Sequence, residues 1–248
     1  MKGIENSSDM LETPEECLWR ATQAHDMAAR ASFAREGLAF PVKEVTPSVR
    51  VLLLRQLYLA AIHRSELDAA LEYADQMVSC EVMRDTAYHD RSRVLFALER
   101  VGDSIRDQRA AARRAPAARR SFHYWCLATL HHHASEWDSA LKAFDRGLRW
   151  AKRDRPLLEA HRALVCLESG SPVSNLRGVV QGLLASPNRD GYGRYVIGML
   201  FTEMGDLPAA AVHLRAFLHR NAGADEAKVL TLRRELDRAR AQLARYAS

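Results

Sequence analysis

The stretch SEWDSALKAFDRGL, residues 135–148, contains the pattern that decides the fold. Ser135 and Asp138 mark a helix N-terminus, because short polar side chains there satisfy backbone N–H groups that have no partner within the helix. Ala140 and Phe144 stand one helical turn apart and therefore share a face. A small side chain lets a second helix approach, and a large one fills the space beside it. The stretch is typical of the second helix of a packed pair.

The same arrangement recurs along the chain. SELDAALEYADQMV at 65–78 and GDLPAAAVHLRAFL at 205–218 place small and large residues at matching positions, and TPEE at 13–16 and TPS at 46–48 add further helix starts. We assign the turns between paired helices to residues spaced by 37, 33, 35 and 35 positions: Ser65, Gly102, Ser135, Gly170 and Gly205. A regular period of this length predicts an array of helix–turn–helix units.

On these residues the chain resembles a tetratricopeptide repeat (TPR) protein over about residues 14–220. The clearest copy, 122–151, has Leu127-Ala128 in its first helix, and the copy at 192–218 has Ile197-Gly198 at the matching place. Weaker copies cover 51–80, 88–115 and 156–185, and the pair at 14–38 is the most divergent. The resemblance implies an all-α, right-handed superhelical α-solenoid of about six helix pairs plus a C-terminal capping helix.

We divide the chain into a disordered N-terminus at 1–13, the repeat array at 14–220 and a C-terminal helix at 221–248. An apolar stripe runs along that last helix at alternating steps of three and four: Val229, Leu232, Leu236, Ala239, Leu243 and Tyr246. We expect the stripe to cover the last repeat. The alternative is a homodimer formed through the same helix.

Composition bounds the remaining possibilities. The chain has 248 residues, is 48% hydrophobic and carries a formal charge of +5. It contains no apolar run long enough for a membrane span and no secretory signal, so we expect a cytoplasmic protein. Four cysteines without paired spacing indicate reduced, mostly buried thiols: Cys17, Cys80, Cys126 and Cys166.

The resemblance also implies a concave groove, lined by the first helix of each pair, that binds a peptide or helix of a partner protein. Groove positions carried over from the family are Arg55, His63, Arg100, Trp125, Thr129, His132, His133, Glu168, Tyr195 and Glu203. Trp125 and Tyr195 are the expected aromatic anchors; the alternative role for both is packing between neighbouring repeats. Basic residues precede acidic ones along this groove, which favours a partner with an acidic and a basic end.

Three consecutive histidines, residues 131–133, raise the question of a metal site. Successive helical residues point about 100° apart, so the three rings cannot converge on one ion. We therefore predict no metal. His131 should pack between helices, whereas His132 and His133 should face the groove and could make it pH-sensitive.

Other function classes are weaker. A basic outer face, Arg106, Arg109 and Arg113, could bind nucleic acid, but it lacks interleaved aromatic residues. A secretion-type chaperone would use the same groove as an adaptor. We find no phosphate loop, nucleophile elbow or metalloprotease motif, and so predict a non-catalytic protein without a cofactor. TPR proteins that bind the carboxyl-terminal tails of chaperones use Asn and Lys pairs on the inner helices. Here the asparagines lie outside the expected inner helices, so the resemblance does not imply a co-chaperone of that type.

Overall fold

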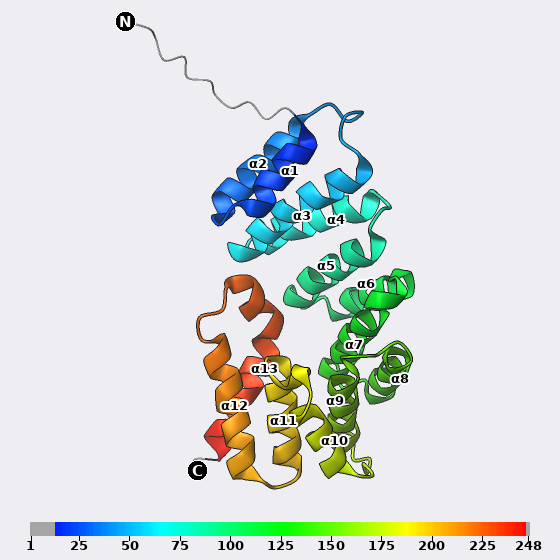
Figure 1. The fold of residues 1–248 in the computed structure, drawn as a ribbon, viewed down its shortest axis with the longest axis vertical. Helices are drawn as coiled ribbons and strands as arrows, with labels where there is room; N and C mark the ends of the chain where they lie inside the picture. Colours follow the sequence, from blue (N-terminus) through cyan, green and yellow to red (C-terminus); the bar gives the residue numbers. More distant parts are fainter. Residues whose placement is uncertain (1–12, 247–248) are drawn as a thin grey trace, which may run out of the picture. The chain divides into compact units, whose positions relative to one another are not determined.

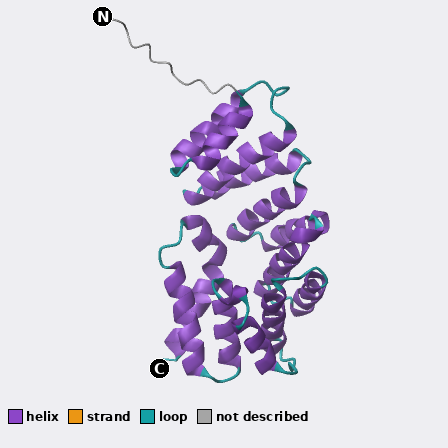
Figure 2. Cartoon of the chain, viewed as in Figure 1, coloured by secondary structure: helices purple, strands orange, loops and turns teal. Residues whose placement is uncertain are grey.

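The computed structural model of the chain describes residues 13–246, and every regular element in that span is helical (Figure 2). The all-α prediction is confirmed for these residues, while the superhelical arrangement remains a prediction. The chain divides into two compact units, Met1–Arg91 and Ser92–Ser248. The N-terminus predicted to be disordered falls outside the described residues except for Thr13. No helix within residues 13–246 is both long and apolar enough to cross a membrane.

Within its described residues, the first unit contains four complete helices and the start of a fifth, which can be followed in Figure 1. They are α1 (Pro14–Gln23), α2 (Met27–Ala39), α3 (Pro47–His63), α4 (Leu67–Ser79) and α5 (Arg84–Ala97), the last of which continues into the second unit. Two predicted starts are confirmed, because Thr13 and Thr46 accept hydrogen bonds from the N–H groups of Glu16 and Val49. Small residues let α1, α2 and α3 pack closely around Leu53, with Cys17 and Ala34 fully buried beside it.

The second unit contains the remaining helices (Figure 1). In order they are α6 (Val101–Arg114), α7 (Ala117–His133), α8 (Trp137–Leu148), α9 (Arg155–Glu168), α10 (Leu176–Leu184), the short 3-10 helix η1 (Pro187–Arg189), α11 (Tyr192–Glu203), α12 (Leu207–Asn221) and α13 (Glu226–Arg245). First helices pack against their second helices, as in α7 with α8 and α11 with α12, and Ser92 of α5 exchanges hydrogen bonds with Ser104 of α6. The described chain therefore forms six helix pairs followed by one further helix.

The turns inside five of these pairs share one backbone conformation. The first helix ends at a left-handed residue: Ser65 (φ 57°), Glu99 (φ 58°), Ser135 (φ 57°), Gly170 (φ 78°) and Gly205 (φ 76°). The next N–H then bonds to the carbonyl five residues earlier, at 2.8–3.0 Å in every case. This is the Schellman arrangement, which satisfies carbonyls that the helix end leaves free.

The assignment of the turn in the third helix pair to Gly102 was wrong. Gly102 lies in the first turn of α6, and Glu99 is the left-handed residue. With Glu99 in its place the five turns are spaced by 34, 36, 35 and 35 residues, which is closer to a constant period. A glutamate seldom adopts this conformation, so its residue type did not mark the turn.

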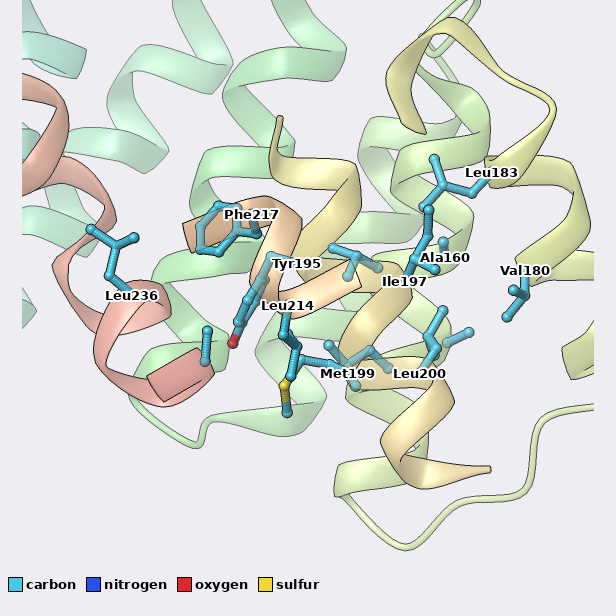
Figure 3. Close-up of a cluster of buried hydrophobic side chains, with 14 residues drawn as sticks. Ala160, Val180, Leu183, Tyr195, Ile197, Met199, Leu200, Leu214, Phe217 and Leu236 are labelled. Carbon is cyan, nitrogen blue, oxygen red and sulfur yellow. The ribbon is translucent and has the colours of Figure 1, made fainter. Parts of the chain in front are cut away.

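One hydrophobic core cluster of the second unit extends from α9 to α13. A Cβ added at Gly198 would stand 2.6 Å from Leu214 Cδ2, so the glycine lets α11 and α12 approach. Figure 3 shows Leu236 of α13 beside Tyr195 and Phe217, all three buried in one cluster. The other residues of the predicted stripe lie in or against the same cluster: Val229, Leu232, Ala239, Leu243 and Tyr246. The stripe on α13 is thus packed within the chain.

Candidate functional site

The polar flank of α13 contacts the first helices of several pairs. The residues it meets form what we call the α13-contact surface: Phe96 and Glu99 at the end of α5, His133 of α7, Glu168 of α9 and Tyr192 of α11. These are positions on or beside the predicted groove. A helix of the same chain therefore lies against His133 and Glu168, two of the residues for which the sequence predicted a partner.

Arg234 anchors α13 at the α5 end of this surface. Its guanidinium lies over the Phe96 ring, 4.5 Å from the centroid, and its Nη2 donates to Glu99 Oε2 at 2.7 Å. Glu99 is 69% exposed, so the ion pair is screened by solvent and contributes on the order of 1 kcal/mol or less. The contact therefore contributes little to the stability of α13 docking.

Glu235 is the buried centre of the interface. It is 2% exposed, and its Oε1 lies 3.0 Å from His133 Nε2 and accepts a hydrogen bond from the Tyr192 hydroxyl at 3.0 Å. Burial raises the pKa of this carboxyl, but the interactions with His133, the backbone and the Tyr192 hydroxyl together outweigh burial, and the net pKa is lowered. Glu235 Oε2 is also buried and has no hydrogen-bond partner among the described residues.

Arg238 forms the second charged contact, one helical turn after Glu235. Its Nη2 donates to Glu168 Oε1 at 2.6 Å, and the other oxygen of Glu168 lies 2.8 Å from His132 Nε2. Burial raises the pKa of Glu168, yet the hydrogen bonds from His132 and Arg238 lower it overall. A buried carboxylate with both oxygens paired is well satisfied, so this contact is tighter than the one at Glu235.

A chain of hydrogen bonds runs inward from Glu168. Trp125 Nε1 donates to His161 Nδ1 at 3.2 Å, and His161 Nε2 lies 3.0 Å from His132 Nδ1. Because an indole nitrogen only donates, the His161 proton must sit on Nε2, and that N–H points at His132 Nδ1. His132 must then carry its own proton on Nε2, where it donates to Glu168. Trp125 thus fixes the tautomers of both histidines.

Within this row of hydrogen bonds, His161 resists protonation. Adding a proton to His161 would place an N–H on Nδ1, directly facing the N–H of Trp125. His161 is fully buried, and burial lowers its pKa well below the ordinary value, with His132, His133 and Arg238 lowering the pKa further. With every ring nitrogen occupied, these side chains stabilise the packing of α7 against α9.

The histidine run thus has three separate roles. His131 is buried, as predicted, and its Nδ1 lies 2.6 Å from Glu136 Oε2. Its pKa is lowered, chiefly by burial and against the opposing effect of Glu136. The described residues contain no group of side chains that could hold a metal ion.

Two predicted groove residues belong to the first unit. Arg55 Nε lies 2.6 Å from Asp90 Oδ2, and Asp90 is fully buried. The pKa of Arg55 is raised, because attraction to Asp90 outweighs the lowering caused by burial. His63 is half-buried at the end of α3. Arg55 thus joins α3 to α5 within that unit.

The other predicted groove residues lie in the second unit. Trp125 is half-buried, Tyr195 is 1% exposed inside the cluster that receives Leu236, and Thr129 donates to the Trp125 carbonyl. Arg100 is exposed and pairs with Asp103, and Glu203 is exposed at the end of α11. The α13-contact surface thus includes His133 and Glu168 from the predicted set, with Trp125 and His132 supporting Glu168 from behind.

The predicted basic face lies on α6. Arg106, Arg109 and Arg113 are all exposed. Arg106 also lies 2.7 Å from Asp103 Oδ1, which compensates part of the positive charge.

Sequence reasoning missed four residues of this site: His161, Tyr192, Glu235 and Arg238. His161 lies two helical turns before Glu168 and therefore on the same face of its helix, which was an available signal. Glu235 and Arg238 flank Leu236 of the apolar stripe, but a charged residue beside a stripe ordinarily faces water.

The comparisons add no relative from which a role could be transferred. Neither the protein-family models nor the curated proteins contain a match to this chain. The function must therefore be argued from the geometry alone.

Proposed function

We propose that this chain is a non-catalytic adaptor or assembly factor that holds a helix of a partner protein on the α13-contact surface. In this proposal the helix pairs are TPR-like, and their first helices provide the binding surface. The observation that carries the proposal is the pair of contacts of Glu235 with His133 and of Arg238 with Glu168, in which both carboxylate side chains are 10% exposed or less. They support a helix as the kind of element that this surface would accept.

The chemistry of the surface suits a helix better than an extended peptide. Glu235 and Arg238 are three positions apart and so share one face of α13, while their partners stand on two different helices, α7 and α9. The apolar stripe on the adjoining face packs at the same time on α11 and α12. An amphipathic helix is the element that presents two such faces together.

The exposed basic face of α6 supports a nucleic-acid role less well. Exposure alone is expected of a solvated helix face, and Arg106 already has an acidic neighbour. A secretion-type chaperone stays the closest alternative, since it would use the same α13-contact surface.

Affinity capture with site mapping tests the adaptor function. The bait chains are the wild type, Arg238→Glu, which places a like charge against Glu168, and Arg240→Glu, a control at a 63% exposed position. We expect Arg238→Glu to retain more of a specific partner, with cross-links from that partner to α7, α9 and α11. Equal capture by all three chains, or cross-links confined to α6 and α8, would overturn the proposal.

A further inference from the structure

We propose that the partner helix repeats the charge pattern of α13: a carboxylate followed three positions later by an arginine, beside an apolar stripe. In α13 this pattern is the segment RELDRA, residues 234–239. The inference rests on the proposed function and names the chemistry that the same site selects.

The selectivity comes from two buried groups of opposite character. His133 and Tyr192 present N–H and O–H groups that need an acceptor, whereas Glu168 presents a carboxylate that needs a donor. Glu168 has a side chain only 10% exposed, so a partner without a cation there would leave a buried charge poorly compensated. Leaving such groups unpaired weakens binding much more than losing an apolar contact.

The spacing follows from the geometry of the two helices that carry these groups. The acceptor of α13, Glu235, contacts α7. Its donor, Arg238, lies one helical turn later in α13 and contacts α9. A helix with the two charges exchanged would place its carboxylate against Glu168. The order of charges therefore sets the direction in which a partner helix can lie.

α13 fits this surface imperfectly, which allows it to be displaced. Glu235 Oε2 is buried without a hydrogen bond among the described residues, and only Glu235, Leu236 and Ala239 of the helix are fully buried. An unpaired buried oxygen weakens binding. A partner that pairs both carboxylate oxygens would bind more tightly than α13 does.

A second copy of the chain is the less suitable occupant. Its α13 would make the same contacts with the same unpaired oxygen. The resident α13 is joined to α12 through residues 222–225, and a short tether of this kind gives an effective concentration in the millimolar range. An identical helix without that tether cannot compete at ordinary protein concentrations.

Peptide binding to the full chain tests the inference. The chain carries Arg238→Glu to loosen its own helix, and three fluorescent peptides cover residues 225–246. The first has the natural sequence, the second carries Glu235→Gln with Arg238→Gln, and the third carries Asp237→Asn with Arg240→Gln. The third is a matched control, because it loses one acid and one arginine that pair with each other at exposed positions.

We expect the natural and control peptides to bind within about threefold of each other, and the second peptide to bind about 30-fold or more weakly. Equal binding of all three would refute the charge pattern while leaving helix binding intact. No binding by any peptide would overturn the proposed function as well. A wild-type dimer that Arg238→Glu converts to a monomer would identify a second copy as the occupant, and would overturn the inference that the occupant is a helix of another protein.

A second variant guards against a misfolded chain. If Arg238→Glu does not give a helical, cooperatively unfolding protein, Leu232→Ala with Leu243→Ala replaces it, because these residues are partly buried and belong to the apolar stripe. The same three peptides and the same expected ratios then apply.

Discussion

His133 and Glu235 are 102 positions apart in the chain, yet His133 Nε2 lies 3.0 Å from Glu235 Oε1. One residue ends the first helix of a repeat pair, and the other lies at the middle of the last helix. Together with Arg238 and Glu168, they join α13 to the surface that the repeat resemblance assigns to a partner.

The first prediction concerns the left-handed turn residues. Ser135→Gly should stabilise the second unit by about 1 kcal/mol, because a non-glycine residue at φ 57° carries a steric cost that glycine does not. Gly205→Ala should destabilise it by a similar amount. Urea unfolding followed by circular dichroism measures both effects.

The matched control for these variants is Gly102→Ala. Gly102 is helical, and no atom outside its chain neighbours and its own helix backbone lies within 4 Å of a Cβ placed there, so alanine should stabilise by about 0.5–1 kcal/mol. If Gly102→Ala destabilised the chain as Gly205→Ala does, the assignment of the turn in the third helix pair to Glu99 would be wrong.

The second prediction concerns the histidine tautomers. At pH 7.5, ring nitrogen chemical shifts should place the proton of His161 and that of His132 on Nε2, since Trp125 donates to His161 Nδ1. Trp125→Phe should release this constraint and produce a mixture of tautomers for His161. Observation of a proton on Nδ1 of His161 in the wild-type chain would contradict the direction of the hydrogen-bond chain.

The third prediction concerns the pH dependence of stability. The folded pKa of His161 is lowered below its unfolded value, so the unfolded chain binds a proton that the folded chain excludes. Stability is therefore greatest above about pH 6.5 and falls as the pH decreases from there, by up to about 1.4 kcal/mol per pH unit for each such histidine. His131 acts in the same direction. Urea unfolding between pH 7.5 and 5 measures the slope.

Variants at two histidines separate this effect from general acid denaturation. His161→Gln should flatten the slope between pH 6.5 and 5, because glutamine can accept from Trp125 and donate to His132 without titrating. His219→Gln, at an exposed position, should leave the slope unchanged. The interpretation fails if the two variants have the same pH profile. The groups facing His161 from neighbouring helices are Trp125, His132, His133, Phe144, Tyr192 and Arg238.

The sequence predicted local features of this protein better than long-range contacts. Helix starts at Thr13 and Thr46 and the stripe from Val229 to Tyr246 depend on neighbouring residues, which a sequence displays directly. The turn at Glu99 was missed because its conformation is imposed by the helix pair and contradicts the preference of glutamate. His161 and Glu235 were missed because their burial depends on partners on other helices.

The aromatic anchors illustrate the same limit. Tyr195 was predicted to face a partner, and it is buried in the cluster that includes Leu236. From the sequence alone, an aromatic residue that binds another chain and one that packs within its own chain have the same spacing. Only the position of α13 distinguishes them.

The most direct test of the central claim, that α13 is a separable occupant of a binding surface, is hydrogen exchange of the intact chain at pH 7. In Arg238→Glu, backbone amides of residues 226–245 should exchange about 30-fold faster than in the wild type, which corresponds to a loss of about 2 kcal/mol in the free energy of docking. The amides of α7 and α9 should keep their protection. Arg240→Glu should behave as the wild type. Equal acceleration in α7, α9 and α13, or none in α13, would contradict the account.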